Sequence, residues 1–399
     1  MALFDHSTIN FDVLRKKAFN YRWAEVPPDV IPLTAADSDF PMAPELVQGL
    51  TEAIQRGYMP YTPKLGYWDV RESIARQLNQ RKDEHVDPNF LLPIDSAARG
   101  MYTIAKVLLK PGDEAIIFDP VDYLFSSSIQ SVGATPVLFP AKVEEDNRIN
   151  LSAFEEYITP KTRMIGLCNP HNPLGVLFSR DDLQFLLDLA EKYDLYIMND
   201  EIWSDIVYPP KKFLSILSLH PAKNHRILSV YGFSKSFSIA GLRAGCIYAA
   251  DQEMFDKLVD ASDVMSTAGG ISSLSQIAAK ICMDECYYWN EAFVRFMQSN
   301  RDYAIARIDK MPGIVSNHPD ALFMLFPDIT GTGMDSQQLT SYLLTEAKLA
   351  TVPGTAQFFG PGAEGHIRIC LATSREVLTE GLNRLELALH KLTPYSSAD

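Results

Sequence analysis

The sequence predicts an α/β protein with a mostly parallel sheet sandwiched by helices in a large domain, and a smaller α/β domain at the C-terminal end. Strand-like and helix-like segments alternate through the middle of the chain, and polar motifs follow the strands. The 399 residues, 47% of them hydrophobic, suffice for two domains. We expect an N-terminal arm over 1–44 that packs with the small domain, a large domain over 45–285, and an interdomain helix and small domain over 286–399.

The charge balance argues against two classes of partner. The chain has 36 basic and 50 acidic residues, a net charge of −14 and no basic run, so we expect no binding to nucleic acid or to an anionic membrane. Its first residues do not resemble a signal peptide, and no apolar stretch is long enough to cross a membrane. We therefore expect a cytoplasmic protein. Its five scattered cysteines do not form a metal-ligand array.

The first third of the chain contains three amphipathic helices and a buried strand. The apolar positions of these helices are Leu46, Val47, Leu50 and Ile54, then Val70, Ile74 and Leu78, then Met101, Ile104, Ala105 and Leu108. The strand covers 114–118. Small residues, Ser96, Ala97 and Ala98, open the third helix, where free N–H groups and the helix dipole suit a phosphate. The alternative is an ordinary cap by Asp95 with no cofactor nearby.

Three strands in the middle of the chain each lead into a polar motif. The strand 164–168 runs into the loop 169–175, the strand 195–198 precedes Asp200, and the β-rich run 227–230 precedes Lys235. Because open α/β sheets bind ligands at the carboxyl ends of their strands, we expect these motifs to form one site.

The last third of the chain is expected to form the interdomain helix and the small domain. Long-helical periodicity covers 276–311, a strand covers 322–326, and helices follow over 335–348 and 375–392. Arg368 lies within a β-like run. Taken out of context, it is either an edge residue facing solvent or a ligand for a carboxylate.

Lys235 is surrounded by small, hydroxylic and apolar residues, which predicts a buried or half-buried amine. Desolvation disfavours its ammonium form and leaves a nucleophile able to form a Schiff base with an aldehyde. Arg243, eight residues downstream, has a guanidinium group suited to a phosphate dianion. The alternative is a surface lysine and a solvated arginine.

Three motifs carry a resemblance to a known family. They are Ser-Lys-x-Phe-x-x-x-Gly-Leu-Arg-x-Gly around Lys235, Asn-Pro-His-Asn-Pro-Leu-Gly over 169–175, and Tyr-Ile-Met-Asn-Asp-Glu-Ile over 196–202. Together they resemble the fold type I pyridoxal-phosphate enzymes of the aspartate aminotransferase superfamily, in the class I/II aminotransferase family. The resemblance extends from about Asp37 to Arg368. It implies a seven-stranded type of sheet, pyridoxal 5'-phosphate as cofactor, and a homodimer.

The resemblance also implies roles for individual residues. Lys235 would form the Schiff base and then act as general base at Cα, Asp200 would keep the pyridine nitrogen protonated, and Arg368 would bind the substrate carboxylate. The remaining cofactor ligands would be Asn172 and Trp203 at the phenolic oxygen, Ser96, Ala97, Ala98, Ser234 and Arg243 at the phosphate, and Tyr61 at the phosphate of the partner subunit. Asn172 would also border the substrate.

Asp122 is the clearest departure from the family pattern. Relatives carry an aromatic residue two positions after the proline at 120, where it stacks on the pyridine ring, but here that position is Asp122 and Tyr123 comes one residue late. Either the turn shifts to bring Tyr123 over the ring, which we favour because a carboxylate on a π face is repelled, or Asp122 contacts the substrate. In the second case the substrate would be an unusual one, such as a basic amino acid.

The resemblance favours an aminotransferase that passes the amino group of an L-amino acid to a 2-oxo acid. The alternative is a carbon–sulfur β-lyase like cystathionine β-lyase, indicated by Asn-Pro-His-Asn-Pro with His171 in the loop 169–175, by Asp-Glu-Ile-Trp-Ser-Asp over 200–205 and by Ala-Ala-Asp-Ser-Asp-Phe over 35–40. A cofactor-bound regulator that contacts a partner protein is a third hypothesis. No basic recognition helix or additional domain supports this third hypothesis.

Overall fold

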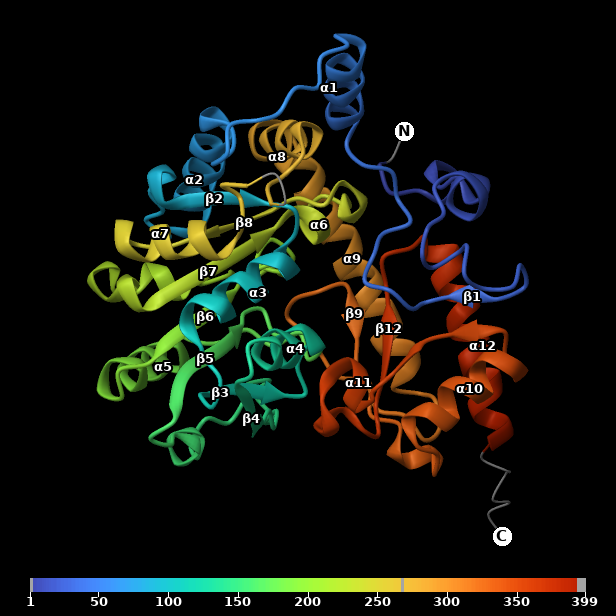
Figure 1. Cartoon of the computed structure of the whole chain (residues 1–399). Helices are drawn as coiled ribbons and strands as arrows, with labels where there is room; N and C mark the ends of the chain where they lie inside the picture. The colour runs from blue at the N-terminus through green and yellow to red at the C-terminus, as the bar shows by residue number, and fades with distance from the viewer. Residues whose placement is uncertain (1–2, 267–268, 393–399) are drawn as a thin grey trace. The chain divides into compact units, whose positions relative to one another are not determined.

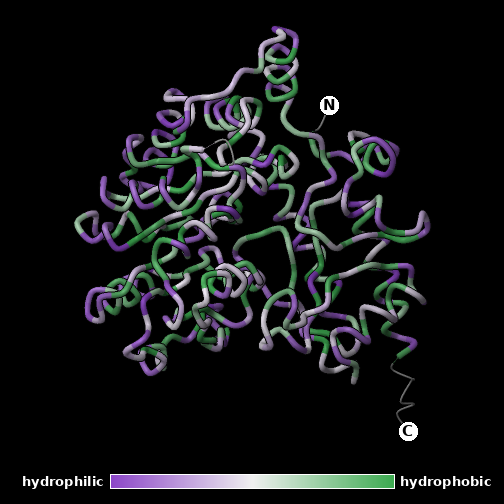
Figure 2. Tube along the Cα trace, viewed as in Figure 1, coloured by the Kyte–Doolittle hydropathy of each residue, from purple (hydrophilic) through white to green (hydrophobic). Residues whose placement is uncertain are grey.

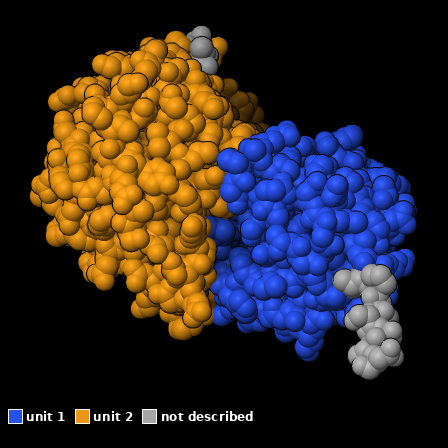
Figure 3. All heavy atoms as spheres, turned by 90° about the horizontal axis from the view of Figure 1, so that it is seen from below, with its two compact units in different colours: residues 1–41, 173–175, 291–399 blue, residues 42–172, 176–290 orange. Residues whose placement is uncertain are grey.

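The computed structural model describes residues 3–266 and 269–392 (Figure 1). The chain divides into two compact units, coloured separately in Figure 3. Unit 1 comprises residues 1–41, 173–175 and 291–399, and unit 2 comprises 42–172 and 176–290. The helix α9, Tyr287–Ile308, begins in unit 2 and continues in unit 1. The N-terminal arm and the C-terminal third of the chain therefore belong to one unit.

Unit 2 is built on a seven-stranded sheet of order β2-β8-β7-β6-β5-β3-β4. Four of the pairings are parallel, and β8 runs antiparallel to both of its neighbours. This confirms the predicted mostly parallel sheet. The strands are β2 (Leu91–Ile94), β3 (Glu114–Asp119), β4 (Thr135–Pro140), β5 (Thr162–Cys168), β6 (Tyr196–Asp200), β7 (Ile227–Gly232) and β8 (Gly245–Tyr248).

The central strands form because they are nearly continuous apolar runs that can be buried on both faces, as parallel strands require (Figure 2). Most helices of unit 2 flank the sheet, and the first of them packs on the last. They are α1 (Pro44–Gln55), α2 (Trp68–Lys82), α3 (Ala97–Leu108), α4 (Tyr123–Ser131), α5 (Arg180–Lys192), α6 (Phe233–Ser236), α7 (Gln252–Ala261) and α8 (Ser273–Glu285). Helix α3 lies close against β7 and β8, and Gly100 permits this approach. A Cβ at Gly100 would stand 2.6 Å from Ile247 and 2.7 Å from Val230.

Unit 1 combines the arm with a small α/β domain. Its strand β1 (Ile31–Pro32) pairs in parallel with β10 (Leu349–Ala350), so the arm completes the small domain as expected. A three-stranded antiparallel sheet has the order β11-β12-β9. The remaining elements are β9 (Met324–Leu325), β11 (Val352–Pro353), β12 (Ile367–Cys370), α10 (Ser336–Glu346), α11 (Ala356–Phe359) and α12 (Arg375–Leu392).

The predicted long helix over 276–311 is wrong in one respect. It is two helices, α8 and α9, and Cys286 between them is the C-cap of α8. Periodicity does not distinguish one long helix from two whose apolar faces continue in register. In the part of the chain that the structure describes, no helix is long and apolar enough to span a membrane.

Candidate active site

Three neighbouring strands of unit 2 bring the predicted cofactor residues to one edge of the sheet. Strands β5, β6 and β7 are consecutive and parallel, with Cys168 paired to Asp200 and Asp200 to Val230. Asp200 ends β6, the loop after β5 carries Asn172, and the single-turn helix α6 after β7 carries Lys235. Separate segments of sequence thus meet at the carboxyl edge of the sheet, where such sheets bind ligands.

Asp200 is a buried carboxylate at this edge. Its Oδ1 accepts a hydrogen bond of 3.0 Å from the Ile202 N–H, and its Oδ2 lies 3.9 Å from the Cys168 thiol. Burial raises the pKa of Asp200 to about 7, and the charges of Asp122 and Glu201 contribute to the rise. A carboxylate in this environment would be stabilised by a nearby cation, so the site fits a protonated pyridine nitrogen.

Asn172 is buried beside Asp122. Its Nδ2 donates a hydrogen bond of 2.9 Å to Asp122 Oδ2, and its Oδ1 has no hydrogen-bond partner among the described residues. An amide NH2 group has two hydrogens, so one remains for an acceptor such as a phenolic oxygen. The Asn172 environment therefore also fits the cofactor.

Asp122 has a structural role that the sequence did not reveal. It is the N-cap of α4, where its Oδ1 accepts a hydrogen bond of 3.1 Å from the Leu124 N–H while its Oδ2 accepts the bond from Asn172. Both carboxylate oxygens are thus engaged within the protein. Tyr123, the first residue of α4, is 49% exposed. The contact of Asp122 with a substrate and the stacking of Tyr123 on the cofactor stay predictions.

The Lys235 amine is half-buried and close to Trp203. Its Nζ lies 5.6 Å from the centroid of the Trp203 ring, which is 2% exposed. Ser234, directly before the lysine, is also half-buried. The lysine is thus only partly solvated, and an aromatic ring borders its amine.

The predicted phosphate ligands lie at the beginning of α3 and after α6. Ser96, rather than Asp95, is the N-cap of α3, and its Oγ accepts a hydrogen bond of 3.1 Å from the Arg99 N–H. Asp95 instead pairs with Arg99 at 3.8 Å. The N–H groups of Ala97 and Ala98 belong to the first turn, which lacks intrahelical acceptors. Arg243 is exposed and adopts a left-handed backbone conformation, with φ 52°.

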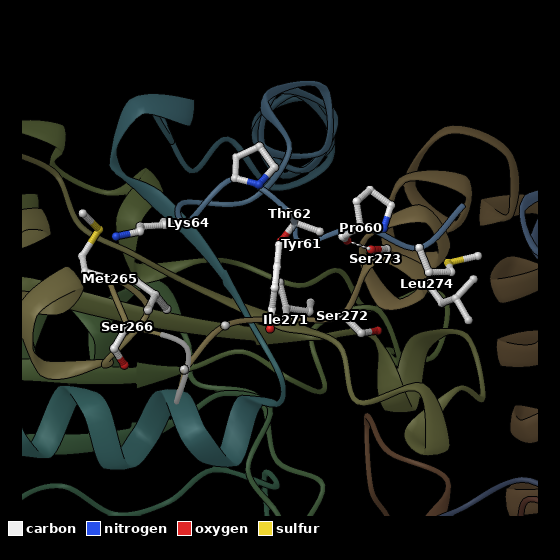
Figure 4. Close-up of a pocket in the computed structure, with 15 residues that line it drawn as sticks. Pro60, Tyr61, Thr62, Lys64, Met265, Ser266, Ile271, Ser272, Ser273 and Leu274 are labelled. Atoms are coloured by element: carbon white, nitrogen blue, oxygen red, sulfur yellow. Dashed lines mark hydrogen bonds between the residues drawn. The ribbon is translucent and has the colours of Figure 1, made fainter. Parts of the chain in front are cut away.

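Tyr61 lies on the wall of a pocket of about 730 Å³ formed by two segments of unit 2. Its side chain is 94% exposed, and Figure 4 shows it extending toward Ile271. Lys64, Met265 and Ser272 also line this pocket. The exposed ring is available to contact another molecule.

Arg368 lies in unit 1, on β12. It is half-buried, and its guanidinium carbon lies 5.1 Å from the centroid of the Phe359 ring. The strand pairs on both sides, with β11 and β9, so Arg368 is not on an edge strand. The first of the two sequence alternatives for this residue, an edge residue facing solvent, is therefore wrong.

Sequence reasoning missed a buried polar cluster next to Lys235. Lys82, at the end of α2, pairs with Asp205, and Asp205 accepts a hydrogen bond from Ser236. The only sequence signal was proximity, since Ser236 follows the lysine and Asp205 comes five residues after Asp200. No local pattern indicated that Lys82, the last residue of α2, would meet them.

Comparison with known proteins agrees with this geometry. The model of the family "Aminotransferase class I and II" matches residues 28–385. The aspartate aminotransferase of Thermotoga maritima is 32% identical over 90% of this chain and 91% of that protein. The solved aromatic aminotransferase of Pyrococcus horikoshii is 29% identical, with a TM-score of 0.85 over 94% of this chain and 99% of that one.

A solved protein from Corynebacterium diphtheriae, assigned as a PLP-dependent β-cystathionase, is 27% identical with a TM-score of 0.86, over 95% of this chain and 98% of that one. The fold is therefore shared by enzymes assigned to both reactions considered from the sequence. The family match, however, covers most of the chain and both units. The chain belongs to the aminotransferase class I and II family and is a pyridoxal-phosphate-dependent aminotransferase.

Proposed function

We propose that Lys235 is the residue that binds pyridoxal phosphate as a Schiff base. The observation that carries this proposal is the meeting of a half-buried amine, the buried carboxylate of Asp200 and the buried amide of Asn172 at the carboxyl edge of one sheet. When bound, the cofactor supplies an electron sink for the bonding electrons of the substrate Cα.

The residues of the chain divide the remaining work. Asp200 holds a proton on the ring nitrogen, and Asn172 and Trp203 donate hydrogen bonds to the phenolic oxygen. Tyr123 packs against the ring. The phosphate is held by the first turn of α3, at Ser96, Ala97 and Ala98, together with Ser234 and Arg243.

Lys235 then acts as general base, taking the proton from the substrate Cα and returning it at another carbon. The Lys235 amine would be free to do so while the substrate, rather than the lysine, is joined to the cofactor. The substrate is an L-amino acid, whose carboxylate binds Arg368 in a bidentate pair, and a 2-oxo acid accepts the amino group. The names of the relatives indicate a dicarboxylic or aromatic amino acid as donor.

The carbon–sulfur lyase alternative has lost part of its support. Two of the three motifs that favoured it contain residues with structural roles: Asp39 forms a fully buried ion pair with Arg22 at 3.5 Å, and the buried His171 ring packs edge-on against Phe118. Burial lowers the pKa of His171 to about 3, so this ring stays neutral. Neither side chain is positioned by its local contacts to select a sulfur-containing substrate.

The Lys235→Ala variant tests the assignment of the lysine. Pyridoxal phosphate added to the wild-type protein should produce a yellow absorbance band that survives gel filtration, and the variant should produce none. Thermal unfolding of both cofactor-free proteins controls for misfolding. A band that persists in Lys235→Ala would overturn the assignment.

A panel of amino acids separates the two reactions. Aspartate, tyrosine, lysine and cystathionine should be supplied with and without a 2-oxo acid, while amino transfer and pyruvate are both assayed. Transfer that requires the 2-oxo acid is expected. Pyruvate formed from cystathionine with no acceptor present would establish the lyase instead.

We also propose that the enzyme is a homodimer in which Tyr61 reaches the cofactor phosphate of the partner subunit. Unit 2 exposes several large apolar side chains, including two on α1 and three in the segment that follows it, and exposed apolar patches mark interaction sites. They are Val47, Ile54, Tyr58, Met59, Tyr61, Trp68 and Tyr288. This exposure supports an additional surface that covers them.

A further inference from the structure

A buried ion pair lies beside the turn that carries Lys235. Lys82 Nζ is 3.2 Å from Asp205 Oδ1, and each side chain is 4% exposed. Lys82 Nζ also donates a hydrogen bond of 2.6 Å to Ser204 Oγ. Removing one partner of such a pair would leave an uncompensated buried charge, so the two groups fix each other's position.

The second oxygen of Asp205 connects this pair to the lysine turn. Asp205 Oδ2 accepts a hydrogen bond of 2.8 Å from Ser236 Oγ and one of 2.5 Å from the Tyr231 hydroxyl. Tyr231 lies in β7, four residues before Lys235, and Ser236 directly follows the lysine. One carboxylate oxygen therefore holds the chain on both sides of Lys235.

The turn needs this support because it cannot stabilise itself. Helix α6 has four residues, and isolated helices of that length do not form in water. A further bond of 2.9 Å runs from Asn290 Nδ2 to the backbone oxygen of Ser236. Contacts at Ser236 thus hold the backbone of the turn from which the Lys235 side chain extends.

We propose that Asp205 is a positioning residue that orients Lys235 for bond formation with the cofactor, acting through Ser236 and Tyr231. The proposal rests on the proposed role of Lys235. Asp205 does not itself reach the reacting atoms, since its two oxygens are engaged by Lys82, Tyr231 and Ser236. We call the contacts of Asp205 with Ser236 and Tyr231 the Asp205 brace. Because misplacement of a reacting group by an ångström has large effects on rate, loss of the brace should slow bond formation at Lys235.

Asp205 keeps its charge in this environment. Burial alone would raise its pKa, but the charge of Lys82 and the hydrogen bonds from Tyr231, Ser236 and Lys82 hold the pKa of Asp205 below its ordinary value. A charged acceptor makes stronger hydrogen bonds than a neutral one. The brace is therefore a carboxylate at neutral pH.

Ser236→Ala tests the proposal, with Ser204→Ala as a matched control. Changing Asp205 itself would leave Lys82 unpaired and risks misfolding, whereas each serine variant removes one buried hydroxyl from the same network. Ser236 lies on the lysine turn. Ser204 binds the opposite partner, Lys82, and donates a hydrogen bond of 2.6 Å to the backbone oxygen of Glu201.

The measurement is the rate at which the visible band appears after pyridoxal phosphate is added to the cofactor-free protein, together with the melting temperature, kcat and KM. We expect Ser236→Ala to slow the band about fivefold or more, the factor that corresponds to one lost hydrogen bond, and to lower kcat more than it changes KM. Ser204→Ala should melt at a similarly reduced temperature but form the band at the wild-type rate.

Equal band rates in Ser236→Ala and Ser204→Ala would overturn the brace and leave a purely structural network. Lys235→Ala is run in parallel. A band that persists in Lys235→Ala shows that the assignment of the lysine has failed, whereas a band that is lost there and unaffected in Ser236→Ala shows that only the brace has failed.

Discussion

Single residues of this site are defined by what surrounds them. Asp200, the last residue of β6, and Asp205, five residues later, both have buried side chains, but their pKa values shift in opposite directions. Asp205 has the Lys82 ammonium group at 3.2 Å, which holds its pKa low, whereas the described contacts of Asp200 are an N–H group and a thiol and burial raises its pKa to about 7. Asp205 is already charge-compensated, and Asp200 is suited to receive a cationic ligand.

This contrast predicts the effect of Asp200→Asn. An amide has nearly the same shape but cannot stabilise a positive ring nitrogen, so the variant should still form the yellow band while the turnover number for amino transfer falls by about 10²-fold or more. Absorbance and steady-state kinetics measure the two quantities. A variant that keeps wild-type turnover would show that Asp200 does not hold the ring proton.

The ends of α2, β6 and β8 carry a second buried polar cluster. Glu84, just after α2, accepts a hydrogen bond of 2.6 Å from Tyr248 in β8, and Glu201, just after β6, accepts bonds from Asn199 and Ser215. The remaining oxygen of each glutamate is buried with no hydrogen-bond partner among the residues described. A single proton held between the two carboxyl groups would satisfy both oxygens.

The cluster predicts a pH-dependent effect of Glu84→Gln. Burial, and next the charge of Glu201, raise the pKa of Glu84 well above its ordinary value. Between the pKa of the unfolded chain, about 4.3, and this raised value, the folded protein holds a proton that the unfolded chain has lost. The wild-type free energy of unfolding should therefore fall as pH rises through this window. The free energy of unfolding of Glu84→Gln, relative to that of wild type, should rise by up to about 1.4 kcal/mol per pH unit.

Thermal unfolding of the cofactor-free proteins between about pH 5 and pH 8 measures this difference. Glu253→Gln is the control, because Glu253 lies on the surface beside Lys257, which lowers its pKa. The control should show no gain with rising pH. Parallel curves for wild type and Glu84→Gln would rule out a proton shared with Glu201.

At the scale of the whole molecule, the proposed dimer makes the site depend on two chains. Tyr61 is 94% exposed although the other predicted cofactor residues of unit 2 cluster at the sheet edge. A tyrosine that contacts the cofactor of the partner subunit must be exposed on the surface of its own chain. A symmetric dimer would place both copies of Tyr61 in equivalent positions.

Complementation between two inactive variants tests this arrangement. Tyr61→Ala and Lys235→Ala homodimers should each transfer amino groups poorly. A purified heterodimer of the two would contain one complete site, with Lys235 from one chain and Tyr61 from the other, and should recover about half of the wild-type turnover. No recovery would place Tyr61 outside the partner's site, and size-exclusion chromatography with light scattering would confirm that heterodimers had formed.

Sequence reasoning predicted the large sheet and the polar residues that follow its strands. Apolar runs of strand length, each ending in a polar motif, were sufficient to predict the parallel sheet and to group Asn172, Asp200 and Lys235 at one edge. The domain boundaries after 44 and 285 stay a prediction. The cytoplasmic location stays a prediction.

Other features depend on contacts between distant segments and were not predictable from local pattern. The break at Cys286, the engagement of Asp122 by both α4 and Asn172, and the salt bridge of Asp39 with Arg22 are of this kind. Periodicity reports which face of an element is buried, but it does not say which side chain meets it across the core.

The sequence by itself determined the family, the cofactor and the mostly parallel sheet of the large domain, because these follow from local apolar patterns and from motifs a few residues long. Tertiary structure alone decided how Lys235 is held. Lys82 and Asp205 are 123 positions apart in the chain (205 − 82) and meet only after the sheet and helices have packed. Their attraction becomes strong because packing removes water from around both charges.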